Sequence, residues 1–306
     1  MVYVDDSIMQ KGSIASAGSK MLENFTALFD ATVITRLNEK NDSLKTERIK
    51  LAEFGLNDPG ELSGQPLLCN DVFGHIRRRA TQQGLCYIRP TYGTVSRFGL
   101  IPTASSMDQI GIVCKDPHEG FYQLSAISGH DENDGAMFPE KKYSYAKTDK
   151  KLNIAGQSLK LPYSDVYSQV LQILAFAEIS GNLSRYDGIK FGYRAQGYKS
   201  LDGLYTKTRT EAFGLEAKLA ITMGCLVLSQ NNYVKYYEKA MKIRRLIKES
   251  LPFTQYDVII IPVDCPLAVL AGLPSLTFSH DGKGIQLVAN IKKESYLLAA
   301  WEALQL

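Results

Sequence analysis

The segment from Cys69 to Cys86 holds an aspartate, a histidine and two thiols that could together do nucleophilic chemistry. Asp71 and His75 are four residues apart, and a carboxylate can orient an imidazole for proton transfer. Cys69 or Cys86 could supply the nucleophile, because a thiolate beside a histidine reacts readily. The alternative is that both cysteines are small buried side chains and that His75 only fills space. The arginines at 77–79 predict either a solvated basic patch or a site for an anion or an RNA backbone.

A second candidate lies in the run from Pro90 to Gly111, which mixes turn residues with apolar anchors. Tyr92-Gly93 and Phe98-Gly99 are turn signals, and Pro102 excludes a central position in a strand ladder. Ser105 and Ser106 follow Ala104, so three small residues stand where backbone could approach a ligand closely. Taken alone, the run indicates either a buried loop and strand or a loop that contacts a ligand.

The rest of the sequence alternates between strand-like and helix-like patterns. The predicted strands lie at 2–4, 110–114 and 258–263, with two more inside 273–289. The continuous apolar run at 258–263 is typical of a central strand buried on both faces. Helices are predicted at 19–37 with a break near residue 29, and at 43–54, 117–128, 164–179, 204–228, 233–251 and 295–304. Asp116 as N-cap and Pro117 as first residue fix the start of the helix at 117.

This alternation predicts an α/β fold, a mixed sheet between helices, in a single domain over residues 1–306. The segment 135–155 is predicted to be a solvent-exposed excursion. The 306 residues carry a formal net charge of only +3, which by itself does not indicate a nucleic-acid partner. The five cysteines and four histidines show no metal-ligand spacing, so no metal or cofactor is expected. With no signal sequence and no long apolar run visible, a cytoplasmic protein without membrane contact is expected.

Several runs resemble the amidase-signature hydrolases, and within them the A subunit of the tRNA-dependent amidotransferases. The resemblance rests on the runs at 17–37, 90–111, 126–131, 182–194, 208–214 and 270–287, which cover nearly the whole chain in the family's order. It implies the amidase-signature fold, a mixed central sheet covered by helices on both faces. The family has a helical segment before the strand at 2–4 and a longer segment where this chain has only 57–65. Part of the core is therefore expected to be missing, from the N-terminus and internally.

The family's catalytic residues have no counterparts in the matching runs. The resemblance implies a lysine base, a serine nucleophile and a second serine in a Gly/Ser-rich loop. Asp5 stands at the place of the lysine and His75 at that of the nucleophile. Phe73 replaces a glycine, and Ser63-Gly64 is the only trace of the loop. A carboxylate cannot offer the positive charge of a lysine, and the lost loop supplies oxyanion donors worth about 10²–10³ in rate each.

The resemblance also implies an amino-acid pocket. Tyr186, Arg209 and Arg244 come from runs that line or approach this pocket in the family's A subunits. Ser105 and Ser106 are further candidate substrate-binding residues, from the loop in which backbone could approach a ligand closely. Arg209 is the best candidate to hold a carboxylate, because a guanidinium does so with two hydrogen bonds. The alternative is an ion pair between Arg209 and either Glu211 or Glu178. The family also has an acidic residue that binds the amino group of the ligand. Asp264 is its only match, and the segment around Asp264 is shorter than in the family.

Three functional interpretations follow. The first is an inactive paralogue of the A subunit that works by binding, as a scaffold, decoy or regulator. The second is an active amidase or glutaminase with a rebuilt site, supplying ammonia for Gln-tRNA formation. The third is an eroding gene product, against which the unbroken family-like run at 182–194 counts. The expected partners are the amidotransferase B and C subunits or a second copy of the chain, with glutamine as a candidate ligand and nucleic acid contacted only indirectly.

Overall fold

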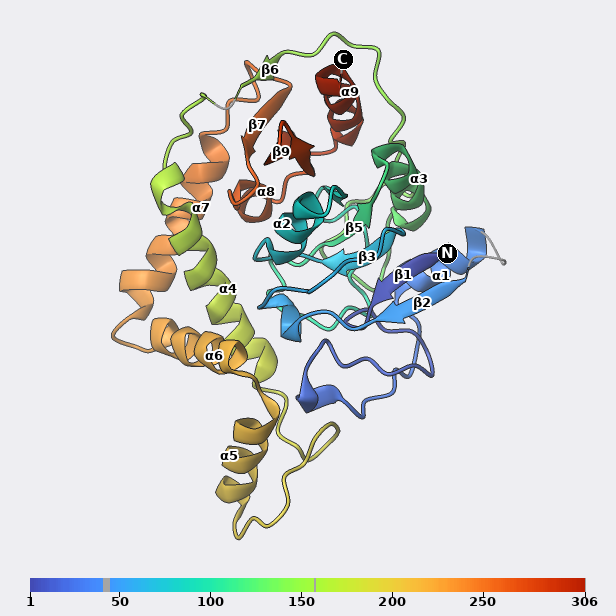
Figure 1. The fold of residues 1–306 in the computed structure, drawn as a ribbon. Coiled ribbons are helices and arrows are strands. Elements are labelled where there is room, and N and C mark those ends of the chain that lie inside the picture. The colour runs from blue at the N-terminus through green and yellow to red at the C-terminus, as the bar shows by residue number, and fades with distance from the viewer. Residues whose placement is uncertain (41–44, 157, 306) are drawn as a thin grey trace.

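The computed structural model describes residues 1–40, 45–156 and 158–305. Its centre is a nine-stranded mixed sheet with the order β2-β1-β3-β5-β4-β8-β9-β7-β6 (Figure 1). The pairs β1–β2, β1–β3 and β6–β7 are parallel and the other neighbours antiparallel. The strands are β1 (Val2–Asp5), β2 (Thr46–Ile49), β3 (Leu67–Asn70), β4 (Cys86–Arg89), β5 (Ile110–Cys114), β6 (Ile154–Ala155), β7 (Val258–Pro262), β8 (Ser275–His280) and β9 (Lys283–Ala289). The predicted α/β fold with a mixed sheet is confirmed.

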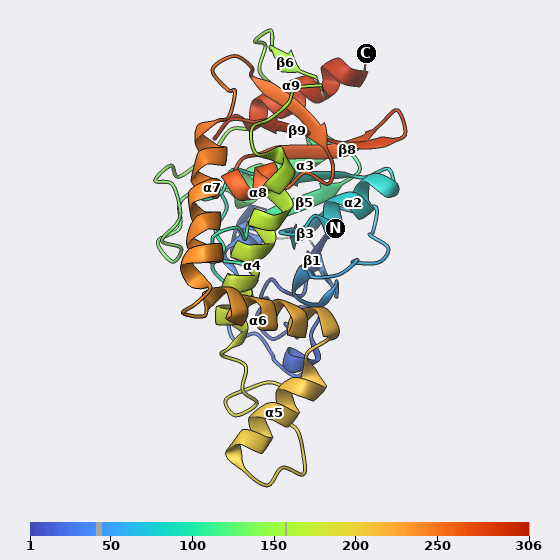
Figure 2. The ribbon, with the colours of Figure 1, turned by 90° about the vertical axis from the view of Figure 1, so that its left-hand side faces the viewer.

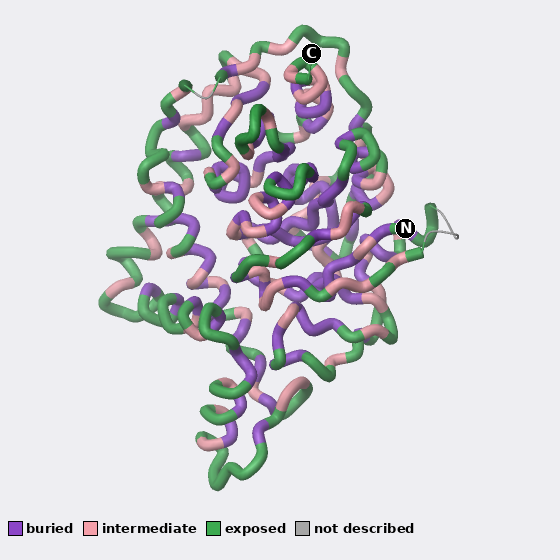
Figure 3. Tube along the Cα trace, in the orientation of Figure 1, coloured by how far each residue is buried: buried purple, intermediate pink, exposed green. Residues whose placement is uncertain are grey.

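Helices cover both faces of this sheet, as expected (Figures 1 and 2). One face packs against α1 (Thr32–Lys40), α3 (Pro117–Ile127) and α9 (Glu294–Gln305). The other packs against α2 (His75–Gln82), α4 (Tyr167–Leu183), α7 (Lys239–Glu249) and α8 (Leu267–Ala271). The buried residues concentrate in the sheet and on the inner sides of these helices (Figure 3). Among the described residues, no helix has the length and apolar character needed to span a membrane.

Local signals placed several elements correctly. The Asp116 side chain accepts a hydrogen bond from the His118 amide, and Pro117 opens α3, so a carboxylate and a fixed φ start the helix as predicted. The β8–β9 hairpin turns at Asp281 and Gly282, which both have positive φ angles (50° and 72°), as a two-residue hairpin turn requires. The excursion at 135–155 is largely exposed, but Tyr145 within it is buried.

Other predictions were wrong. Of the helix predicted at 43–54, residues 43 and 44 lie outside the described part, and the rest holds strand β2 and the 3-10 turn η2 (Glu53–Gly55). The first half of the helix predicted at 19–37 is a 3-10 turn, η1 (Lys20–Leu22), followed by loop. The strand at 258–263 is not central, because only the two-residue β6 lies outside it.

The helix predicted at 204–228 is two helices. α5 (Leu201–Ala212) ends at Phe213, and α6 (Leu215–Leu228) starts after Gly214, so the expected weak point at Gly214 is a break. Inside α6, Gly224 packs on α4, where an added Cβ would lie 2.0 Å from the Phe176 carbonyl oxygen. The helix predicted at 233–251 begins as a π-helical segment, η4 (Tyr233–Glu238), and continues as α7.

Candidate functional site

His75 is the first residue of α2 and lines a cavity of about 380 Å³. The cavity is also lined by Leu56, Asn57, Asp58, Phe73, Gln172, Phe176 and Glu216. An Arg78 guanidinium nitrogen lies 2.9 Å from His75 Nδ1. A guanidinium can only donate, so Nδ1 accepts and the ring hydrogen is on Nε2. Burial, and then the charge of Arg78, lower the pKa of His75. The ring is therefore a neutral donor with its basic nitrogen occupied, which is unsuited to a general base.

Asp71 does not orient this imidazole. Its carboxylate accepts hydrogen bonds from the Ile76 and Arg77 amides and forms a buried ion pair with the Arg77 guanidinium at 3.1 Å. Within the described residues, no hydrogen bond joins Asp71 to His75. The Asp71–His75 pair that a rebuilt site would use is therefore not formed among the described residues. Asp71 instead fixes the first turn of α2 by accepting from its free amides.

The arginine run is also not a free basic patch. Arg77 is buried against Asp71, Arg78 pairs with Asp264 at 3.3 Å, and Arg79 pairs with Asp58. Each guanidinium is thus paired with a carboxylate, and Arg77 is buried, whereas Arg78 and Arg79 remain partly exposed as the solvated-patch prediction expects. Asp264, which the sequence matched to the family's acidic residue for the amino group of the ligand, is therefore paired with Arg78.

Asp5 is buried at the end of β1. The Ser7 hydroxyl donates to its carboxylate, and burial raises the pKa of the Asp5 carboxyl to about 7. The neighbouring Asp6 accepts hydrogen bonds from the Ser16 and Gly18 amides. This pair of carboxylates holds the N-terminal loop, and neither can supply the positive charge of a lysine.

The thiols proposed as nucleophiles are buried. Cys69 on β3 and Cys86 on β4 are separated by β5 and are 0% and 6% exposed. Burial raises the pKa of the Cys69 thiol well above its usual value and that of Cys86 to about 12. Both are therefore protonated at neutral pH, and a protonated thiol is a poor nucleophile. The alternative interpretation, small buried side chains of the core, agrees with the structure.

Cys225 should be the thiol that reacts first with a disulfide reagent such as dithionitrobenzoate. It is exposed on α6, whereas Cys69, Cys86 and Cys114 are buried and Cys265 is partly so. We expect one rapid phase, corresponding to one thiol per chain, that disappears in Cys225→Ser and persists in Cys265→Ser. A rapid phase that survives Cys225→Ser would contradict this placement of the cysteines.

Ser105 and Ser106 contact α4. Ser106 donates both its amide and its hydroxyl to the Glu178 carboxylate, at 2.8 and 2.5 Å. Arg244 of α7 donates to the Ser106 hydroxyl at 2.8 Å and to its carbonyl at 3.0 Å. Asn182 donates to the Ser105 hydroxyl at 3.2 Å. The loop is thus tied to two helices through a carboxylate and a guanidinium.

Arg209 and Tyr186 meet at the C-terminal end of α4. Arg209 donates to the carbonyls of Leu183 and Tyr186, both at 2.9 Å, and lies 4.9 Å from the centre of the Phe213 ring. No carboxylate of the described chain pairs with Arg209, so the predicted ion pair with Glu211 or Glu178 is wrong. Tyr186 is buried and stacks on Phe54, with ring centres 6.1 Å apart. A cationic side chain at these carbonyls stabilises a helix end.

The structure therefore gathers four predicted residues around one helix end. Ser105 and Ser106 contact Asn182 and Glu178 in the last turns of α4, and Arg209 contacts the carbonyls of Leu183 and Tyr186 where the helix ends. Glu178 and Asn182, which hold the serines, were missed as their partners. Their spacing of four would have indicated a shared face only if the helix predicted at 164–179 had been continued to residue 183, as α4 is. A cavity of about 330 Å³ beside Ser105 is lined by Arg97 and Arg185 among others. No cluster of described His, Cys, Asp and Glu side chains is arranged to hold a metal ion.

Comparisons with known proteins identify the family. The sequence profile of the family described as Amidase matches residues 68–157 and 137–291. The A subunit of the Listeria monocytogenes glutamyl-tRNA(Gln) amidotransferase is 32% identical over 391 aligned positions, covering 97% of this chain and 81% of the relative. Because this chain has 306 residues, at least 85 of those positions are gaps in it. The relative therefore has internal segments that this chain lacks.

Solved structures share the fold. The A subunit of the Thermotoga maritima glutamyl-tRNA(Gln) amidotransferase superposes with a TM-score of 0.70 at 22% identity, covering 97% of this chain and 80% of that one. The peptide amidase of Stenotrophomonas maltophilia superposes with a TM-score of 0.74 at 18% identity, covering 99% and 82%. The chain therefore belongs to the amidase-signature family and is similar, over nearly its whole length, to the A subunit of the tRNA-dependent amidotransferases.

Proposed function

We propose that this chain is a non-hydrolysing relative of the amidotransferase A subunit that works by binding. The observation that carries the proposal is that neither His75 nor Asp5, which stand where the family has its nucleophile and its base, is free to act as one. His75 has its basic nitrogen occupied by Arg78, and Asp5 is a buried carboxyl held by Ser7. An activated nucleophile needs an adjacent free base, and neither residue is one.

The surface of α6 supports a binding role. Ala217, Ala220, Gly224 and Val227 face the core. On the opposite side, Leu215, Leu219, Met223 and Leu226 form a stripe at helical spacing and are 78%, 49%, 39% and 49% exposed. We call these four residues the α6 stripe. A helix that is apolar on all sides is normally buried, and a contiguous exposed apolar surface marks an interaction site.

Charge indicates what covers the α6 stripe. After it, η4 and α7 lie on the same side of the molecule (Figure 2) and carry five exposed cations, Lys235, Lys239, Lys242, Arg245 and Lys248, against Glu238 and Glu249. Both carboxylates are already paired, with Lys242 and Arg245. A second copy of the chain would bring like charges together, which disfavours association. The occupant we propose is another amidotransferase subunit with an acidic rim, in keeping with relatives that are named as subunits.

Co-expression with the B and C subunits of the same organism, followed by gel filtration with light scattering, tests this role. We expect the chain alone to be poorly soluble, without forming a stoichiometric oligomer, and to elute as a monodisperse complex with a partner. Leu219→Glu/Met223→Glu should weaken that complex on the order of a hundredfold, because charges replace apolar anchors at the centre of an interface.

Leu28→Glu/Ile291→Glu is the matched control. It also exchanges two exposed apolar side chains for carboxylates, in segments outside α6, and should leave the complex intact. A stable monomer that never co-elutes with either of the two partners would contradict the proposal. A stoichiometric dimer alone that the α6 variant disrupts would show instead that the occupant is a second copy. In either case, melting shifts with glutamine, glutamate and aspartate would test small-molecule binding next.

A further inference from the structure

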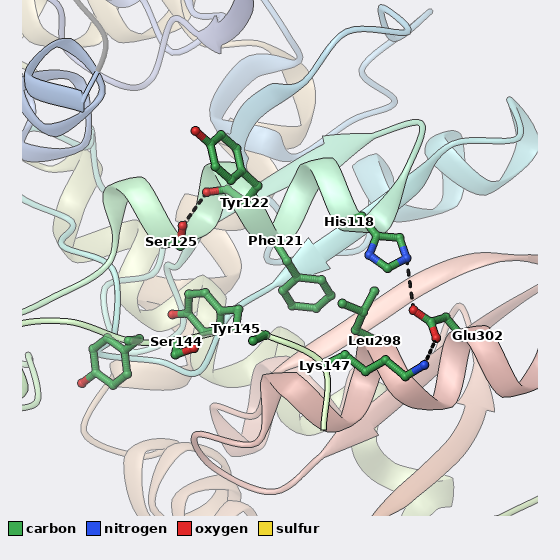
Figure 4. Close-up of a pocket in the computed structure, with 11 residues that line it drawn as sticks. His118, Phe121, Tyr122, Ser125, Ser144, Tyr145, Lys147, Leu298 and Glu302 are labelled. Carbon is green, nitrogen blue, oxygen red and sulfur yellow. Dashed lines mark hydrogen bonds and ion pairs between the residues drawn. The ribbon is translucent and has the colours of Figure 1, made fainter. Parts of the chain in front are cut away.

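A hollow of about 500 Å³ lies between α3, α9 and the segment 143–147, on the face of the sheet opposite His75. Its walls are aromatic at one end and charged at the other (Figure 4). Tyr143 and Tyr145 stack with ring centres 6.4 Å apart and planes 14° apart. Tyr145 also packs on Phe121, 6.1 Å away. The three rings form a row in which Tyr145 is buried and Tyr143 is partly exposed.

The charged end is internally balanced. Glu302 of α9 accepts from Lys147 and lies 3.2 Å from the His118 ring nitrogen, as Figure 4 shows. Its carboxylate is therefore compensated by Lys147. A negative ligand entering the hollow would not meet an uncompensated negative charge there.

A second hollow of about 490 Å³ continues from the first, because both are lined by Ser125 and Tyr143. It is lined by Arg36, Lys40, Lys141 and Lys142, with Glu39 as the one carboxylate among its lining residues. Lys141 and Lys142 are exposed. The linings of the two hollows together hold five cations and two carboxylates. The linings therefore carry a local excess of three positive charges.

Charge and ring geometry together select the ligand class. Stacked tyrosines beside a carboxylate could suit a cation, but the surplus of lysines opposes one. A flat aromatic group that carries negative charge fits both features, since bases stack on aromatic side chains and phosphates attract lysines.

We propose that the two hollows form one groove that binds a nucleotide unit, with the base against Tyr143 and the phosphate at Lys141 and Lys142. This inference goes beyond the proposed function and does not depend on it. Under this proposal the chain contacts a nucleotide directly, whereas the sequence led us to expect only indirect contact with nucleic acid. The unit can be a free mononucleotide or one residue of single-stranded RNA, which share this chemistry.

Fluorescence anisotropy of a labelled single-stranded RNA decamer, titrated with the full chain, tests the groove. We expect saturable binding that weakens between about 50 and about 200 mM salt. Tyr143→Ala should weaken it about tenfold or more through lost stacking, whereas Tyr143→Phe should bind like the wild type. Lys141→Ala/Lys142→Ala should reduce the salt dependence by about 1.4 in log–log slope.

Lys235→Ala/Lys239→Ala, which removes two exposed lysines from η4 and α7, is the matched charge control and should change binding little. Competition separates the two ligand sources. Displacement by AMP identifies a mononucleotide site, and failure of AMP to displace the decamer identifies a strand site. The proposal is overturned if no saturable binding is seen, if ribose 5-phosphate competes as well as AMP, if Tyr143→Ala binds like the wild type, or if both lysine variants weaken binding equally.

Discussion

Replacing Arg77 by methionine should lower the free energy of unfolding by about 3–5 kcal/mol, the usual cost of leaving one partner of a buried ion pair uncompensated. Arg77 and Asp71 are each 2% exposed, and the guanidinium also donates to the Val263 carbonyl at 2.9 Å. Methionine is an apolar side chain of similar length, so the substitution leaves little cavity. The loss of unfolding free energy therefore comes mainly from the Asp71 carboxylate, which stays buried without a partner. Urea denaturation with an unchanged m-value would measure it.

The neighbouring Arg79 provides the control. It pairs with Asp58 at the surface, where ion pairs contribute about 0–1 kcal/mol, so Arg79→Met should change stability little. Asp71→Asn/Arg77→Met should recover part of the loss, because no charge then remains buried. Equal losses in Arg77→Met and Arg79→Met would contradict the assignment of Asp71–Arg77 as the pair that fixes the start of α2 and hence His75.

Stability should fall as the pH rises from about 4 through about 7, owing to Asp5. Its folded-state pKa is raised from 3.8 to about 7, so in this window the folded protein binds more protons than the unfolded chain. The stabilising contribution of the Asp5 carboxyl is fully present below the pKa that Asp5 has in the unfolded chain. It is lost as the pH rises through the pKa that Asp5 has in the folded protein. At about 1.4 kcal/mol for each pKa unit, the contribution is at most about 4 kcal/mol.

Asp5→Asn should remove this dependence, since an amide does not titrate. Unfolding free energies of the wild type and Asp5→Asn, measured from pH 5 to pH 8 (about two units below the folded pKa to about one unit above it), should diverge towards high pH, with the variant becoming relatively more stable. Asp149→Asn, at an exposed position, should leave the wild-type slope unchanged. Parallel curves for the wild type and Asp5→Asn would show that Asp5 is ionised in the folded protein throughout.

Elements defined by local signals could be predicted from the sequence, and those defined by distant contacts could not. The cap at Asp116 and the turn at Asp281–Gly282 depend on neighbouring residues and were placed correctly or nearly so. Strand β2 was mistaken for helix because its charged residues favour a helix locally. Its pairing with β1, and the hydrogen bond from Arg48 to the Ile8 carbonyl, decide its conformation instead.

The candidate site shows the same division. Ser105, Ser106, Tyr186 and Arg209 were predicted as substrate-binding residues, and in the structure the serines contact Glu178 and Asn182 of α4 while Arg209 contacts the carbonyls of Leu183 and Tyr186. Sequence patterns could not predict the partners of Ser106, because Glu178 and Arg244 lie 72 and 138 positions away in the chain. The loss of the base at His75 likewise depends on the ring's orientation towards Arg78, which no motif specifies.

Ammonia release from glutamine by the purified chain tests the central claim most directly. We expect no ammonia above the blank from the wild type, nor from asparagine or simple amides. Asp5→Lys/His75→Ser should also remain inactive, because residues that act as a unit do not restore activity singly and the Gly/Ser-rich loop is absent from the sequence. Ammonia release by the wild type that disappears in His75→Ala would contradict the account and establish a rebuilt hydrolytic site.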